Sequence, residues 1–104
     1  MALADDLVMR DRWSGEGKHV VAATVISVSG SAPRPPGARL LLSSSGEVVG
    51  SVSSGCVEGD VIARAEQVIA GAPAAVVTYG ISDEQAFEVG LSCGGTIRVL
   101  IEPW

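Results

Sequence analysis

Aromatic residues are scarce in this 104-residue chain, because Phe, Trp and Tyr together make up 4% of it, whereas hydrophobic residues make up 47%. Its core must therefore be built from Val, Ile, Leu and Ala, a composition that favours β-strands. Charged residues are also few, at 18%, so the chain can bury enough apolar surface to offset its ordering entropy, which excludes a disordered protein. The length is that of a single domain, which we expect to span residues 1–104.

Positive charge is limited as well. Lys and Arg number 7 against 12 Asp and Glu, for a net charge of −5, which argues against a nucleic-acid-binding surface. The chain has no apolar run long enough for a membrane span, and Asp5 and Asp6 stand where a secretory signal would carry basic residues. We therefore expect a cytoplasmic protein that binds neither nucleic acid nor membranes. Two cysteines are too few for a disulfide scaffold and are expected to be thiols.

Hydrophobic periodicity predicts the order αβββαβ(α)β, an α+β domain in which helices pack on a mixed sheet of about five strands. The strand over residues 19–28 is apolar on both faces, which is typical of a buried central strand. A helix that starts at Val57 and stops near Gly71 places Val61, Ala65, Val68 and Ala72 on one face. The other predicted elements are a helix over 3–14, a hairpin of strands 38–44 and 47–52 joined through Ser45-Gly46, strands 74–79 and 96–102, and a short helix that starts at the capping box 82–85 and stops at Gly90.

Eight of the thirteen glycines fall in three segments next to strands. The first glycine segment, GSAPRPPGAR over residues 30–39, is stiffened by prolines and carries Arg34, Gly37 and Arg39. Arginine presents a planar fork of donors that suits phosphate or carboxylate, so this segment is a candidate anion site. The alternative is a stiff surface connection with solvated arginines.

The second glycine segment covers residues 50–59 and forms a predicted turn from a strand into a helix. Free backbone N–H groups and the positive helix end favour an anion there, and they also favour the thiolate of Cys56. The alternative makes Gly55 a helix cap, Cys56 a small buried residue, and Glu58 a complement to the helix dipole.

The third glycine segment, GLSCGGT over residues 90–96, places Cys93 beside glycines that allow a ligand to come close. Because Cys56 and Cys93 share this context, we expect them to belong to one site. Zinc fits poorly, since two cysteines and the lone His19 cannot complete four ligands. Another metal on Cys56 and Cys93 stays open, and neither a nucleophile–base arrangement nor a dinucleotide or P-loop motif is present.

Four motifs resemble the N-terminal domain of the XdhC/CoxI family, whose members are accessory proteins of molybdenum hydroxylases such as xanthine dehydrogenase and aerobic carbon monoxide dehydrogenase. They are GSAPRPPGAR (30–39), SSGCVEG (53–59), YGISDE (79–84) and GLSCGGTI (90–97), in the family's order, and the resemblance covers nearly the whole chain. The sequence departs from the family at Ser54, where a second glycine is common. Members of the family usually carry a C-terminal Rossmann-like domain after this one. We expect that domain, and with it any role for NAD, to be absent here.

The resemblance implies a cofactor chaperone rather than a turnover enzyme. Such a protein binds molybdenum cofactor as cargo, supports its sulfuration and delivers it into the apo-enzyme of a molybdenum hydroxylase. Its further partners would be a cysteine desulfurase or a separate Rossmann-domain chain. The residues that we expect to bind the cofactor are Arg34, Gly37, Arg39, Gly55, Cys56, Glu58, Cys93, Gly94 and Gly95.

Two other interpretations remain open. The chain could be a thiol redox or sulfur-relay protein that uses Cys56 and Cys93 as nucleophiles. It could instead be a non-catalytic interaction module of a split accessory protein. Because small sheets with exposed edges often pair, we also expect a homodimer.

Overall fold

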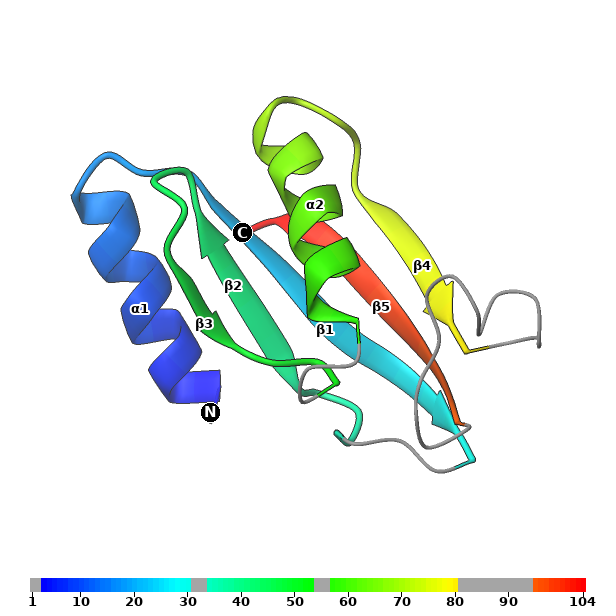
Figure 1. Cartoon of the computed structure of the whole chain (residues 1–104). Helices are drawn as coiled ribbons and strands as arrows, with labels where there is room; N and C mark the ends of the chain where they lie inside the picture. Colours follow the sequence, from blue (N-terminus) through cyan, green and yellow to red (C-terminus); the bar gives the residue numbers. More distant parts are fainter. Residues whose placement is uncertain (1–2, 31–33, 54–56, 81–94) are drawn as a thin grey trace.

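The computed structural model describes residues 3–30, 34–53, 57–80 and 95–104. They form two helices and five strands, which confirms the α+β class and the number of strands (Figure 1). The predicted short helix over 82–90 lies outside the described residues. The elements are α1 (Leu3–Gly15), β1 (Val20–Ser29), β2 (Arg39–Ser43), β3 (Val48–Gly50), α2 (Glu58–Ile69), β4 (Ala75–Tyr79) and β5 (Thr96–Pro103).

The strands form one sheet in the order β3-β2-β1-β5-β4 (Figure 1). Every pair in this sheet is antiparallel, where we expected a mixed sheet. The reason is that β5 lies between β1 and β4 and runs opposite to both, so the strands that share a direction are never neighbours. As a result β1, β3 and β4 all end at the same end of the sheet, and β2 and β5 begin there. We call this the glycine-loop end.

The main core lies between α2 and the sheet. Val61, Ala65 and Val68 are buried on the inner face of α2, as the periodicity predicts. The helix ends at Ile69, before Ala72, and Gly71 follows with a φ of +114° that favours glycine. The largest fully buried apolar side chains facing α2 are Val21, Val25, Leu40, Val52, Tyr79, Ile97, Val99 and Ile101.

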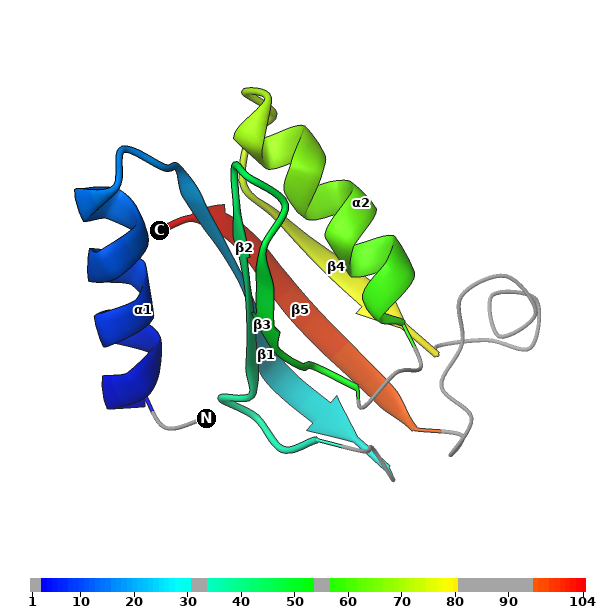
Figure 2. The ribbon, with the colours of Figure 1, turned by 60° about the vertical axis from the view of Figure 1, so that its left-hand side comes forward.

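Helix α1 packs on the opposite face of the sheet, so the sheet lies between the two helices (Figure 2). The buried indole of Trp13 contributes to a second, smaller core with Val20, Ala22 and Leu41 of β1 and β2. The main contacts of α1 are with β1 and β2, and on the same face of the sheet Val76 of β4 is 45% exposed.

Strand β1 is central, as predicted, but it is not buried on both faces along its whole length. Residues 20–23 are buried, whereas Ile26 is 42% exposed. The pairing of β1 with β5 shifts between Val25 and Ser27, so Ile26 is the extra residue of a β-bulge. The expectation of an apolar environment on both faces is therefore wrong for the second half of the strand.

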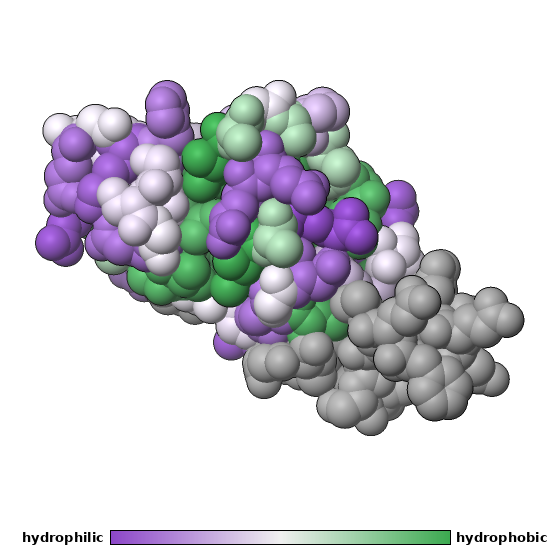
Figure 3. Space-filling view, turned by 45° about the horizontal axis from the view of Figure 1, so that its top comes forward, coloured by the Kyte–Doolittle hydropathy of each residue, from purple (hydrophilic) through white to green (hydrophobic). Residues whose placement is uncertain are grey.

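The outer side of α2 carries hydrophilic residues, among them the exposed Arg64, Glu66 and Gln67, with hydrophobic residues along its borders (Figure 3). This division matches the one-sided hydrophobic pattern of the helix. Neither described helix is long and apolar enough to cross a membrane.

Candidate functional site

The three glycine segments are anchored at one end of the sheet. Strand β1 leads into the first segment at Gly30, β3 leads into the second at Gly50, and the third runs into β5 through Gly95. Gly30 has a φ of +73°, and a Cβ added to it would lie 3.6 Å from the Cα of Gly95. The first and third segments therefore meet at the backbone, where neither residue carries a side chain.

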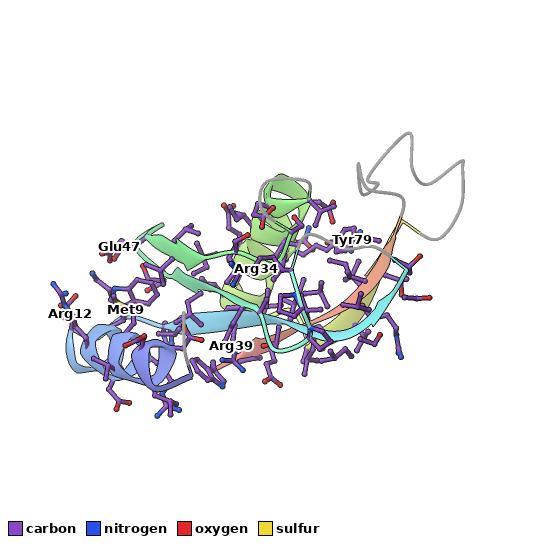
Figure 4. The ribbon with its side chains drawn as sticks, turned by 90° about the horizontal axis from the view of Figure 1, so that it is seen from below. Met9, Arg12, Arg34, Arg39, Glu47 and Tyr79 are labelled. Atoms are coloured by element: carbon purple, nitrogen blue, oxygen red, sulfur yellow. The ribbon has the colours of Figure 1, made fainter. Side chains whose placement is uncertain are left out.

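The described part of the first segment is fastened to β1. The N–H of Gly37 donates to the carbonyl of Val25 at 2.8 Å, and the N–H of Val25 donates to the carbonyl of Ala38 at 2.9 Å. Arg34 lies at the start of this stretch, on the α2 side of the sheet (Figure 4). Its Nε is buried and has no hydrogen-bond partner among the described residues. Such an unpaired donor on a charged group is costly unless something accepts from it.

Arg39 has a different environment, on the α1 side of the sheet (Figure 4). Its Nη1 donates to Oδ2 of Asp6 at 2.9 Å, and Asp6 is only 1% exposed. Its Nε donates to Oγ1 of Thr24 at 3.1 Å, and its Cζ lies 5.0 Å from the centre of the Trp104 ring. The guanidinium therefore ties α1 and Trp104, which follows β5, to the start of β2, and the structure does not bring it together with Arg34.

Glu58 begins α2, and its carboxylate turns back onto the loop that follows β3. Oε2 accepts from Oγ of Ser51 at 2.7 Å and from the N–H groups of Val52 and Ser53 at 2.9 Å each, while Oε1 accepts from Oγ of Ser53. Burial raises the pKa of this carboxyl, but the hydrogen bonds from Ser53, Ser51 and the two backbone groups outweigh burial and lower the pKa to about 2. Glu58 is therefore ionised and engaged by its own loop.

A second polar network joins the end of β4 to the first turns of α2. Oη of Tyr79 donates to Oδ2 of Asp60 at 2.6 Å, and Nε of Arg64 donates to the same oxygen at 2.7 Å. Burial raises the pKa of Asp60, but the hydrogen bonds from Tyr79 and Arg64 prevail and lower it. Sequence reasoning did not include these residues in the site, although Tyr79 opens the YGISDE motif.

Comparison with known proteins identifies the family of this chain. The sequence model of the XdhC and CoxI family matches residues 13–80, a span that holds the first two glycine segments and both networks around α2. The chain belongs to this family.

Two curated relatives and one solved structure show the same likeness. The chain is 32% identical over 96 residues to a probable xanthine dehydrogenase subunit of Bacillus subtilis, covering 90% of this chain and 29% of that protein. It is 32% identical over 85 residues to "Molybdenum cofactor insertion chaperone PaoD" of Escherichia coli, covering 82% of this chain and 26% of that protein. A crystal structure described as a xanthine dehydrogenase from Bacillus halodurans superposes with a TM-score of 0.75 at 36% identity, covering 94% of this chain and 30% of that one. The chain thus spans under a third of each relative.

Four of the predicted site residues of this XdhC and CoxI family domain, Gly55, Cys56, Cys93 and Gly94, lie outside the described residues. Within the described ranges, no three His, Cys, Asp or Glu side chains come close enough together to hold a metal ion. His19 is exposed.

A pocket of about 370 Å³ lies at the opposite end of the family domain, where β1 begins and α2 and β5 end. Its walls are apolar at Val20, Val68 and Trp104 and polar at Ser14, Lys18 and His19. Lys18 is already paired with Glu16 and Glu47. The pocket therefore lacks the unpaired cation that Arg34 supplies at the glycine-loop end.

Proposed function

We propose that this chain is a cytoplasmic cofactor chaperone that binds molybdenum cofactor at the glycine-loop end and delivers it to a molybdenum hydroxylase. One observation carries the proposal most directly: Gly30 and Gly95 meet at the backbone, in the end of the sheet that also holds Arg34. Family membership supports it, as does the name of the Escherichia coli relative, a molybdenum cofactor insertion chaperone.

The chemistry of the described residues fits an anionic ligand. Molybdopterin carries a phosphate, a dithiolene and a polar pterin. Arg34 has a buried Nε in need of an acceptor, which a phosphate oxygen would satisfy with a charge-assisted hydrogen bond. Because neither Gly30 nor Gly95 carries a side chain, the backbones of the first and third segments come close together at the end of the sheet that holds Arg34. When bound, the cofactor would supply the molybdenum chemistry of the recipient enzyme, and this chain would hold and orient it.

The proposal has finer parts that concern sulfur and partners. We assign Cys56 and Cys93 the task of holding the metal or sulfur of the cargo as thiolates. In this scheme sulfuration precedes delivery, and a cysteine desulfurase and the apo-enzyme are successive partners. The thiol redox alternative uses the same cysteines as nucleophiles but needs no cofactor, which allows the two functions to be separated.

A binding and transfer experiment tests this function. The chain is incubated anaerobically with molybdenum cofactor, separated from free cofactor, and mixed with a cofactor-free xanthine dehydrogenase-type enzyme. We expect retained cofactor and activation of the apo-enzyme. A protein that retains no cofactor, yet exchanges disulfides through Cys56 and Cys93, would support the redox alternative and overturn the chaperone function.

We also propose that the chain forms a homodimer. Strand β4 is an edge of the described sheet, and its residues Ala75 and Val76 are exposed, uncharged and compatible with strand pairing. Light scattering at about tens of micromolar, suited to an interface of modest size, should give twice the chain mass. A monomer at that concentration would contradict the prediction.

A further inference from the structure

The start of α2 is held by side chains from the loop before it. Val57 occupies the N-cap position and makes no side-chain cap hydrogen bond, although Ser, Thr, Asp and Asn are the usual caps. Instead Oγ of Ser53, four residues earlier, accepts from the N–H of Val57 at 2.9 Å. Ser53 is fully buried and also donates to the carboxylate of Glu58 through both its N–H and its hydroxyl.

The other side of the loop is fixed by β2. The N–H of Ser51 donates to the carbonyl of Arg39 at 3.1 Å. Gly50 passes so close that a Cβ on it would lie 2.2 Å from the same carbonyl oxygen, and its φ is +81°. Residues 51–53 are therefore confined between the backbone of β2 and the carboxylate of Glu58.

From these contacts we infer that Glu58 is a positioning residue, whose carboxylate shapes the turn over residues 51–53 and thereby acts on cargo binding without touching the cargo. This inference rests on the proposed function and replaces the expectation that Glu58 binds the cofactor directly. The turn ends at Ser53, whose hydroxyl accepts from the N–H of Val57, so the turn holds both of the residues that flank 54–56 in the sequence.

A carboxylate suits this position better than an amide. At least four donors point at Glu58, two from serine hydroxyls and two from backbone N–H groups. A carboxylate only accepts, whereas the amide of Gln would aim its own NH₂ donors at some of them. The substitution Glu58→Gln therefore keeps the size of the side chain but loses part of the network.

The test compares Glu58→Gln with Glu66→Gln, a control with the same charge change on the exposed side of the same helix. Two quantities are measured for each variant: the affinity for molybdenum cofactor, and the NMR shifts of the Val52 and Ser53 amide protons, which report hydrogen bonds to the carboxylate. For Glu58→Gln we expect both amide protons to move upfield and the affinity to fall about tenfold or more. We expect neither change for Glu66→Gln.

Ser51→Ala keeps the inference testable if Glu58→Gln does not fold. It removes a donor to Glu58 from the loop side and leaves the carboxylate in place. A positioning role predicts weaker cofactor binding in this variant too. The inference is overturned if either folded variant binds as well as the parent, or if Glu58→Gln loses affinity while the Val52 and Ser53 amides stay unchanged, because Glu58 would then contact the cargo. Failure of the parent itself to bind would overturn the proposed function instead.

Discussion

Two arginines of one glycine segment differ in what surrounds them. Arg39 forms an ion pair with the buried Asp6, donates to Thr24 and lies over Trp104. Arg34 has a buried Nε without a partner among the described residues. The residue type is the same, but among the described residues the structure shows partners for the first guanidinium and none for Nε of the second.

Replacing Arg39 should destabilise the domain. Arg39→Ala leaves the carboxylate of Asp6 buried at 1% exposure without its cation, and breaking such a pair costs about 3–5 kcal/mol. Urea unfolding of Arg39→Ala, with Arg12→Ala as a control in an exposed ion pair, measures this loss. An unfolding free energy equal to that of the parent would show that the Asp6 contact is not what keeps α1 on the sheet.

Glu58 should make stability depend on acid. Its pKa is about 2 in the folded chain, against an ordinary 4.5. A lowered pKa means that the ionised group stabilises the fold above about pH 4.5, and that this contribution is lost as pH falls toward 2. Thermal unfolding between about pH 6 and pH 2.5 should show a smaller fall in Tm for Glu58→Gln than for the parent. Parallel curves would contradict the assigned network.

At the scale of elements, α2 connects the core to the site. Its buried face packs on the sheet. In its first turns, Asp60 accepts a hydrogen bond from Tyr79, and Glu58 accepts hydrogen bonds from the loop after β3. The helix therefore sets how the ends of β3 and β4 stand relative to each other. Damage to its packing should remove both the fold and the site.

A charge on the buried face of α2 tests this. Val61 is 0% exposed, and Val61→Asp would place an unpaired carboxylate in the core, which is among the most destabilising kinds of substitution. Ala63→Asp places the same charge on the exposed side of the helix and serves as the control. Circular dichroism should show an unfolded chain for the first and a native one for the second. A folded Val61→Asp would contradict the packing described for α2.

Local patterns in the sequence predict the elements but not the contacts between distant residues. The period of α2, the hairpin at Gly46 and the run of β5 follow from side-chain alternation and glycine positions, and the structure confirms them. The pairing of Arg39 with Asp6 joins residues 33 positions apart and has no local signal. The hydrogen bonds to Glu58 have no local signal either, because only the folded loop shows that Ser51 and Ser53 donate to its carboxylate.

At the scale of the whole molecule, the all-antiparallel sheet brings the described ends of the three glycine segments to one end. The three glycine segments, Arg34 and the N-terminal end of α2 share the glycine-loop end (Figure 1). Arg39 with its buried partner Asp6 lies across the sheet, on the α1 side. The net charge of −5 does not exclude an anionic cargo, because a local cation such as Arg34 can attract an anion against the charge of the whole chain.

The most direct test of this account is the affinity of Arg34→Ala for molybdenum cofactor, measured by equilibrium binding beside Arg12→Ala, which removes the same charge from α1. Loss of a charge-assisted hydrogen bond of about 1.5–3 kcal/mol predicts an affinity lower by roughly ten- to a hundredfold, with Tm unchanged and with Arg12→Ala binding like the parent. Cys56→Ser should likewise retain the fold while holding less cofactor. Parent-like binding by Arg34→Ala, or a loss of binding that only follows a loss of thermal stability, would contradict a cofactor site at the glycine-loop end.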